Sequence, residues 1–509
     1  MLETTRSSEA TVGSLLAQQA LIRPADIAVE SEGHIQSFAR LNERVNRLAN
    51  ALMARGVGHG DRVAVLSENR GEYLEVHFAA AKIGAIVCAL NWRLTDSEQS
   101  HCVNLTDPKI YLVSVRFKKN MKVLTSSVGT TIVLGPMYEE MLRKSSTAEP
   151  DELVQPEDAL VILYTSGTTG LPKGAVISHR AFLARVSVFC SDYGMGREDT
   201  FVAWAPMFHM ASTDLAIGMI LIGGKVIIVD GFNLVRLGEI IASERLGWLV
   251  LMPGVTDRLI THIKAKEITT EKILMVGAMA DLLPPGQVQE ISRLLSCPFL
   301  NSFGSTETGI PPCSADLLYP DDSSFSLSKQ QNSFCTVKLV DEDDNEVPVG
   351  VVGELAIRGP TLFSGYWNAE DVNKKDFRGG WFHMGDVFRR NVDGTFDFMD
   401  RAKYLIKSGG ENIYPAEIER VLLEDERIVD AVVVKRTDPH WGEVPVAVVA
   451  RHKSSIMEDQ VLELCRSKLA GYKQPKTVMF ADIADLPRST TGKILRHEVE
   501  SMVLRGCFQ

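Results

Sequence analysis

The chain has 509 residues, a formal net charge of −11, 45% hydrophobic residues and 23% charged residues. This balance is typical of a globular protein, and the length exceeds what one hydrophobic core organises, so we expect two or more domains. Lys and Arg form no basic block, which argues against nucleic acid as a general partner, because binding a phosphate backbone requires a basic surface.

Neither a targeting segment nor an integral membrane segment is predicted. Residues 1–14 are polar and mixed in charge, unlike a secretory signal. The longest apolar stretch, 215–229, is interrupted by Gly223, Gly224 and Lys225, which leaves it too short to cross a bilayer. The eight cysteines show no CxxC or Cys/His ligand spacing, which favours reduced thiols and a cytoplasmic location.

Helical and strand patterns alternate along the first half of the chain. Residues 37–55 carry apolar side chains at helical spacing and precede a strand at 62–66, and residues 72–82 indicate a helix before a strand at 85–90. Such alternation predicts layered α/β subdomains with a largely parallel sheet. Further strands are predicted at 159–164, 225–229, 248–251 and 273–276.

In the second half, the sequence pattern changes at residue 336 and again after residue 400. Residues 336–400 are rich in Gly and turn dipeptides around short strands, which predicts an antiparallel, β-barrel-like portion. Beyond residue 400 the pattern predicts a small α+β domain. We therefore expect a large N-terminal domain at 1–400 and a C-terminal domain at 401–509, with elements at 415–424, 428–435, 444–451, 458–470 and 477–480.

The segment 164–174 (YTSGTTGLPKG) follows a predicted strand and combines glycines, hydroxyls and one lysine. Glycines let backbone N–H groups converge on an anion, and hydroxyls and a cation add to its binding. It is not the P-loop of kinases, because Lys173 is followed by Gly174. Gly/Ser/Thr-rich stretches are usually surface loops, yet the density of donors here favours a nucleotide phosphate site, with candidates Thr165, Ser166, Gly167, Thr168, Thr169, Gly170 and Lys173.

This segment resembles the signature loop of the adenylate-forming superfamily, which includes acyl- and aryl-CoA synthetases, peptide-synthetase adenylation domains and luciferases. Further motifs of that family follow in the expected order, so the resemblance covers roughly residues 10–500. The acyl-CoA synthetase branch is the most similar. The resemblance implies ATP, Mg²⁺, coenzyme A and a carboxylic acid as ligands, and a C-terminal domain that moves.

Residues 301–309 (NSFGSTETG) resemble the family's metal and adenine motif. The resemblance implies that Glu307, with Thr165, holds Mg²⁺, a cation that prefers oxygen ligands. Phe303 would stack on adenine in place of the commoner tyrosine, and Thr306 would touch the α-phosphate. The remaining nucleotide contacts implied are Gly277, Ala278, Asn301, Ser302, Gly304, Ser305 and Phe398.

Asp386 and Arg401 match two more positions of the family. Asp386 would accept both ribose hydroxyls, which a carboxylate can do, and Arg401 would contact the ribose and phosphate side of the nucleotide. His383, nearby in the sequence, has no partner pattern and is interpreted as structural.

The last motifs lie beyond residue 400 and depend on the resemblance alone. Lys403 matches the interdomain hinge, and Lys407, Ser408, Gly409 and Gly410 match the loop beside the CoA thiol. Lys493, in residues 487–496, matches the lysine that enters the active site during adenylation. In the family the C-terminal domain rotates about the hinge between the two half-reactions, exchanging this lysine for the loop.

The acyl pocket is predicted from residues 204–212 and later positions. Amino-acid-activating relatives have an aspartate where this chain has His209, so an amino acid substrate is disfavoured and His209 is expected to act as a gate. The other candidates are small or apolar, which favours an uncharged fatty, alicyclic or aryl acid. They are Trp204, Met210, Ala211, Leu215, Met252, Gly277, Met279, Ser302, Gly304 and Gly309.

Three alternatives remain open at this point. The acyl group could pass to a carrier-protein thiol, although the chain has no carrier domain of its own. A luciferase-like oxygenase shares the adenylation step, and a non-catalytic nucleotide-binding protein is disfavoured by Lys493, Glu307 and Asp386. The sequence leaves the oligomeric state open, a homodimer included, and gives no role to residues 331–335 (QNSFC), which replace a Gly-rich stretch of the family.

Overall fold

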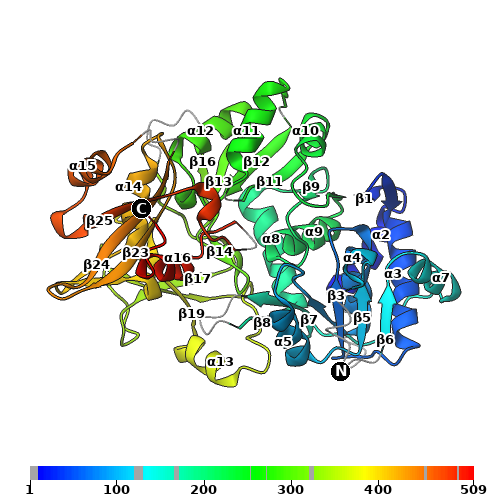
Figure 1. Cartoon of the computed structure of the whole chain (residues 1–509). Coiled ribbons are helices and arrows are strands. Elements are labelled where there is room, and N and C mark those ends of the chain that lie inside the picture. Colours follow the sequence, from blue (N-terminus) through cyan, green and yellow to red (C-terminus); the bar gives the residue numbers. More distant parts are fainter. Residues whose placement is uncertain are drawn as a thin grey trace.

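The computed structural model describes residues 10–119, 130–165, 171–252, 254–270, 272–319, 326–451, 456–489 and 492–508. In Figure 1 the blue and cyan N-terminal elements lie at one side and the orange and red C-terminal elements at the other. The described residues form three sheets of five to eight strands, one four-stranded sheet and one two-stranded sheet. No helix of the described part is long and apolar enough to cross a membrane.

The first sheet has six strands in the order β6-β5-β3-β4-β7-β8, and every pair is parallel except β7 with β8. Its inner strands are almost fully buried, which explains their continuous apolar sequences. The strands are β3 (Arg62–Leu66), β4 (Ile86–Ala89), β5 (Ile110–Val113), β6 (Thr130–Val133), β7 (Ala159–Thr165) and β8 (Lys173–Ser178), with helices α3 (Phe38–Met53), α4 (Gly71–Ile83), α5 (Asp96–Thr106) and α7 (Pro136–Lys144).

The second sheet has eight strands in the order β16-β13-β12-β11-β9-β10-β1-β2, parallel throughout except at its two ends. The strands are β1 (Ile27–Ser31), β2 (His34–Ser37), β9 (Thr200–Ala203), β10 (Lys225–Ile228), β11 (Leu246–Val250), β12 (Ile273–Ala278), β13 (Phe299–Asn301) and β16 (Leu317–Leu318). The associated helices are α2 (Val12–Ile22), α8 (His179–Tyr193), α9 (Met210–Ile222), α10 (Leu234–Ser243), α11 (Thr256–Ala265) and α12 (Pro285–Leu294). The predicted α/β alternation is confirmed.

The predicted antiparallel portion is a four-stranded sheet with the order β17-β18-β19-β20. Its strands are β17 (Thr336–Val340), β18 (Val352–Arg358), β19 (Phe382–Arg390) and β20 (Phe396–Arg401), and α13 (Glu370–Asp376) lies between β18 and β19 in the chain. Hydrogen bonding among the described strands follows a linear path from β17 to β20. The sheet is therefore open, whereas the sequence predicted a barrel-like form.

The C-terminal part builds its own sheet, and the valines of β23 show how it is covered on both faces. Val433 packs with α14 and α15, whereas Val432 and Val434 pack with α16, as the two-residue period of a strand requires. Both hydrophobic clusters come from residues 406–508 alone. The elements are β21 (Ile406–Ser408), β22 (Glu411–Ile413), α14 (Pro415–Leu423), β23 (Ile428–Asp438), β24 (Gly442–Arg451), α15 (Glu458–Lys468), β25 (Thr477–Ala481) and α16 (Arg496–Leu504).

Candidate active site

The predicted site residues of the N-terminal part gather where parallel strands end. Strands β9, β11, β12 and β13 run in the same direction, so the residues after them meet at one edge of the eight-stranded sheet. Ligands of open α/β sheets bind at such carboxyl edges. The positions that follow these strands include His209, Met252, Met279 and Ser302.

The ends of the phosphate segment face each other across the β7–β8 pair. Thr165 and Lys173 are direct cross-strand partners in its register. The Lys173 ammonium lies 4.2 Å from the centre of the Tyr366 ring. The predicted phosphate ligands between the two strands, Ser166, Gly167, Thr168, Thr169 and Gly170, lie outside the described residues.

Glu307 lies in the turn between β14 (Gly304–Ser305) and β15 (Gly309–Pro312). Its carboxylate oxygen Oε1 accepts a 2.8 Å hydrogen bond from the Tyr366 hydroxyl, and its carbonyl accepts one of 2.8 Å from the Phe363 N–H. A Cβ at Gly304 would lie 2.0 Å from the Gly309 carbonyl oxygen, so the close approach of these strands excludes a side chain there.

Phe303 is buried in an aromatic cluster. Its ring lies 4.8 Å from that of Phe388 and 5.4 Å from that of Phe398, the latter also a predicted nucleotide contact. The backbone of Phe303 is held by the Ser314 hydroxyl, which accepts from its N–H at 2.6 Å and donates to its carbonyl at 3.0 Å. The Asn332 side chain in turn accepts from the Ser314 N–H. Asn332 of the atypical 331–335 stretch thus holds the Phe303 backbone through Ser314.

Two other predicted nucleotide residues, Asn301 and Ser302, form hydrogen bonds with backbone groups of the protein. The Asn301 side chain accepts from the Ala280 N–H and donates to the Leu327 carbonyl, so its amide group is already bonded within the protein. The Ser302 N–H donates to the Ala278 carbonyl. Thr306 and Ser305 are partly exposed in the β14–β15 turn. A nucleotide contact from these residues stays a prediction.

Arg185 of α8 is a buried residue that the sequence did not single out. Its guanidinium pairs with Asp214 of α9 at 2.9 Å and donates to the carbonyls of Thr361 and Thr306 at 3.0 and 3.1 Å. Burial raises the pKa of Asp214, and Arg185 opposes that shift. One buried cation thereby ties the segment before Glu307 to the segment before Tyr366. Buried arginines give no periodic signal, so only the structure reveals this anchor.

Asp386 and Arg401 lie opposite each other in the β19–β20 register. The Arg401 Nε donates to Asp386 Oδ1 at 3.0 Å. Burial raises the pKa of Asp386, whereas Arg401 and Lys493 lower it; Asp386 raises the pKa of Arg401. Asp386 and Arg401, fifteen residues apart in the sequence, therefore face each other on the paired strands β19 and β20. His383, predicted to be structural, is buried with its Nδ1 3.3 Å from Glu354.

Lys493 belongs to the C-terminal part and lies within electrostatic range of Asp386, Arg401 and His209. The residue is exposed to solvent, yet protein surrounds it on enough sides to lower its pKa by desolvation. Arg401 adds to this lowering and Asp386 opposes it. The structure thus brings Lys493 to the predicted nucleotide residues of the N-terminal part, over 90 residues away in sequence.

His209 caps α9, with its Nδ1 accepting from the Ala211 N–H at 3.2 Å. Burial lowers its pKa to about 4, and the positive charges of Lys493 and Arg93 contribute. The ring is therefore neutral at neutral pH and carries its proton on Nε2. This arrangement gives the site an uncharged N–H donor beside Lys493.

The predicted acyl-pocket residues divide by exposure. Met210, Ala211, Met252 and Met279 are partly exposed, as residues lining a cleft would be. Ser302 is also partly exposed and Gly304 is exposed, whereas Trp204, Leu215, Gly277 and Gly309 are buried. The Trp204 indole donates to the Val250 carbonyl, Leu215 belongs to the main core, Gly277 packs on Leu300, and Gly309 packs on Arg185.

The hinge and thiol-loop candidates lie at the start of the C-terminal sheet. Lys403 is exposed in the 3₁₀ turn Ala402–Tyr404, and its ammonium lies 4.9 Å from the Tyr404 ring. Lys407 and Ser408 belong to β21. Gly409 and Gly410 both have positive φ in the turn to β22, a conformation typical of tight two-residue hairpins.

The side chains that could act as metal ligands limit how a metal ion could bind. The described residues contain no group of three or more His, Cys, Asp or Glu side chains arranged to hold one. Mg²⁺ commonly binds through one or two carboxylates together with substrate phosphates. Glu307 fits that mode. Its side-chain hydrogen bond with Tyr366 engages Oε1, and the carboxylate has further acceptor capacity for a cation.

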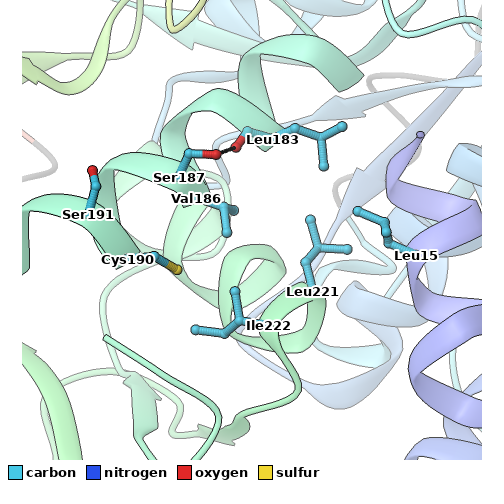
Figure 2. A pocket seen from close by; sticks show the side chains of 8 residues that line it. All are labelled: Leu15, Leu183, Val186, Ser187, Cys190, Ser191, Leu221 and Ile222. Carbon is cyan, nitrogen blue, oxygen red and sulfur yellow. Dashed lines mark hydrogen bonds between the residues drawn. The ribbon is translucent and has the colours of Figure 1, made fainter. Parts of the chain in front are cut away.

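A separate apolar groove lies between α2, α8 and α9 (Figure 2). Leu15, Leu183 and Leu221 line it together with Cys190. None of the predicted site residues lines this groove, so it is distinct from the acyl pocket candidates.

The chain is similar to known proteins over almost its whole length. The family model described as AMP-binding enzyme matches residues 16–367, and the model described as AMP-binding enzyme C-terminal domain matches residues 417–493. Indoleacetate–CoA ligase of Aromatoleum aromaticum is 32% identical over 96% of this chain and 97% of its own length, and feruloyl-CoA synthase of an Amycolatopsis species is 32% identical over 96% and 98%.

Among solved structures, o-succinylbenzoate CoA synthetase of Bacillus subtilis, in complex with its acyl-adenylate intermediate, is similar to this chain. It has a TM-score of 0.83 and 26% identity, over 96% of this chain and 97% of its own. The matched family models, the two CoA ligase relatives and this fold agree with one another. The chain belongs to the AMP-binding enzyme family and, within it, to the adenylate-forming acyl-CoA synthetases.

Proposed function

We propose that the orientation described here is the one in which this AMP-forming acyl-CoA synthetase adenylates its acid. The observation that carries the proposal is that Lys493 lies within electrostatic range of Asp386, Arg401 and His209. A carboxylate oxygen attacks the α-phosphorus of ATP, and the bond to pyrophosphate breaks. Two anions approach each other in this step, so Lys493 and Arg401 are suited to stabilise the developing charge.

Other residues then have positioning roles. Asp386 accepts the ribose hydroxyls, and Lys173 with the phosphate segment holds the pyrophosphate part. Neutral His209 donates its Nε2–H toward the acyl carboxylate. Glu307 would hold a magnesium ion, which would neutralise charge on the phosphates. Most of the rate gain comes from positioning and electrostatics, because the substrate carboxylate is already a nucleophile.

In the second step the thiol sulfur of coenzyme A attacks the acyl carbonyl, and AMP leaves. We propose that the part beyond residue 401 rotates about Lys403 between the steps, withdrawing Lys493 and presenting the turn at Gly409–Gly410. The separate hydrophobic clusters of residues 406–508 support movement as a unit. Limited proteolysis that releases a stable fragment beginning near residue 403 would support this boundary.

We propose an uncharged aryl carboxylic acid as the substrate class. Three of the partly exposed pocket candidates are methionines, Met210, Met252 and Met279, whose thioethers adapt to flat ligands and contact aromatic rings favourably. The buried charges Arg185 of α8 and Asp214 of α9 pair with each other. Indoleacetate and ferulate, named in two relatives, are acids of this class.

The test is an acid-dependent pyrophosphate-release screen with and without coenzyme A. We expect aryl acids to release pyrophosphate faster than straight-chain acids of similar size, and coenzyme A to convert a single turnover into many. Preference for long alkyl acids would contradict the substrate class. Release that coenzyme A does not accelerate would indicate a carrier-protein thiol as acceptor.

A homodimer and a cytoplasmic location also remain proposals. Sedimentation of the purified chain tests the first and cell fractionation tests the second. A monomer at enzyme-assay concentrations would remove the dimer proposal without affecting the reaction.

A further inference from the structure

Tyr366 contacts two predicted ligand-binding residues, although no motif singled it out. Its hydroxyl donates to Glu307 Oε1 at 2.8 Å, and its ring centre lies 4.2 Å from the Lys173 ammonium. One side chain therefore touches both the carboxylate expected to hold the metal ion and the cation expected to hold the phosphates.

The Tyr366 ring is fixed from several directions. Its N–H donates to Asn373 Oδ1 at 2.7 Å, and the Asn373 amide donates back to its carbonyl at 2.8 Å. A strand bridge joins it to Ala175, two residues beyond Lys173, and the ring of Phe363 packs edge-on at 4.9 Å. The phenol is buried apart from a small fraction, so its hydroxyl has a defined direction.

The same segment holds Glu307 a second time, because the Phe363 N–H donates to the Glu307 carbonyl. Glu307 is thus fixed at its backbone and at its side chain by residues three apart. No ion pair joins Lys173 directly to Glu307 among the described residues, and the tyrosine contacts the charged groups of both. Direct pairing would neutralise both groups before a nucleotide arrived.

We propose that Tyr366 is a positioning residue that keeps the Glu307 carboxylate and the Lys173 ammonium apart and aimed at one phosphate group. This inference rests on the proposed roles of Glu307 and Lys173. The phenol O–H orients the carboxylate through a hydrogen bond to a charged group, and the ring face attracts the ammonium. Both groups are then preorganised, so neither has to reorient when a magnesium nucleotide binds.

Two substitutions separate the contributions of the hydroxyl and the ring. Tyr366→Phe keeps the ring beneath Lys173 and removes only the hydrogen bond to Glu307. Tyr366→Leu removes both contacts. Unfolding temperatures of the two variants, measured beside the natural chain, show whether each remains folded.

The experiment is calorimetric titration of the full chain with ATP, once with Mg²⁺ and once with EDTA. We expect Tyr366→Phe to lose about tenfold in affinity with Mg²⁺, the order of one hydrogen bond to a charged group, and less than about twofold with EDTA. Tyr366→Leu should lose affinity under both conditions, because Lys173 loses its aromatic contact. Natural affinity of Tyr366→Phe with Mg²⁺ would overturn the proposal.

A double-substitution cycle with Glu307→Gln tests whether Tyr366 acts through Glu307. If Tyr366 acts through Glu307, Tyr366→Phe changes Mg²⁺-dependent ATP binding little in the Glu307→Gln background. Additive losses would refute the coupling. The titrations contain neither acid nor coenzyme A, which separates this inference from the proposed function: a natural chain that binds magnesium nucleotide but shows no ligase activity would contradict the proposed function alone.

Discussion

The two sides of the candidate site are held in place very differently. On the N-terminal side, Glu307 is fixed by Tyr366 and Phe363, and the buried Arg185 ties their segments together. On the C-terminal side, Lys493 is exposed, and its backbone is bonded to Ser489: the Ser489 N–H donates to the Lys493 carbonyl, and the Lys493 N–H donates to the Ser489 hydroxyl.

The N-terminal side carries residues expected to bind the nucleotide, whereas Lys493 on the C-terminal side is expected to act in one chemical step. Groups that hold the nucleotide must keep their geometry through both half-reactions, and a buried network provides that stability. A charge needed in only one half-reaction has to leave afterwards, which favours an exposed side chain on a separate unit. We call the N-terminal side of the site the fixed side and the C-terminal side, which carries Lys493, the withdrawable side. Substitutions at Arg185, Asp386 and Lys493 test this contrast.

The largest effect is expected at Arg185, on the fixed side. Arg185→Leu leaves Asp214 buried without its partner, which costs about 3–5 kcal/mol of unfolding free energy. Urea unfolding measures the loss. The double variant Arg185→Leu with Asp214→Leu should recover part of it, since no lone charge remains. A loss below about 1 kcal/mol in the single variant would contradict the anchor.

A smaller effect, confined to nucleotide affinity, is expected at Asp386. Asp386→Asn keeps the shape but loses the charged acceptor, so ATP binding should weaken by about 10- to 100-fold. The natural chain should discriminate against 2′-deoxy-ATP, whereas the variant should bind both nucleotides almost equally. Equal discrimination by both proteins would show that Asp386 does not receive the ribose hydroxyl.

The smallest effect concerns pH. An ammonium is charged below its pKa, and the pKa of Lys493 is lowered, so adenylation should fall with rising pH below the ordinary lysine value of 10.5. Lys493→Arg should move this fall to higher pH. Pyrophosphate release measured from pH 7 to 10.5 reveals it. The same fall in thioester formation from synthetic acyl-adenylate would assign it to another group.

Local patterns predicted the elements well, because they depend on neighbouring residues. The predicted strand 62–66 has the bounds of β3, and the strand predicted at 159–164 differs from β7 by one residue. The pairing of β1 with β10 was not predictable, since almost two hundred residues separate them. Nor was the open form of the antiparallel sheet, which depends on contacts between its edges.

The candidate site also shows that local sequence patterns do not predict long-range contacts. Family motifs identified Asp386, Arg401 and Lys493, and the structure brings these three together. Tyr366 and Arg185 were missed because their importance comes from the loops they join, not from a local pattern. Asn301 was predicted as a nucleotide contact from its motif position; its amide also bonds backbone groups, and the nucleotide contact stays a prediction.

The most direct test of a withdrawable side is Lys493→Ala assayed in both half-reactions. We expect pyrophosphate release to fall about 100-fold or more, the order of one charge-stabilising donor. Thioester formation from synthetic acyl-adenylate and coenzyme A should remain close to that of the natural chain. Equal losses in the two half-reactions would contradict the account, because Lys493 would then serve both steps and have no reason to leave.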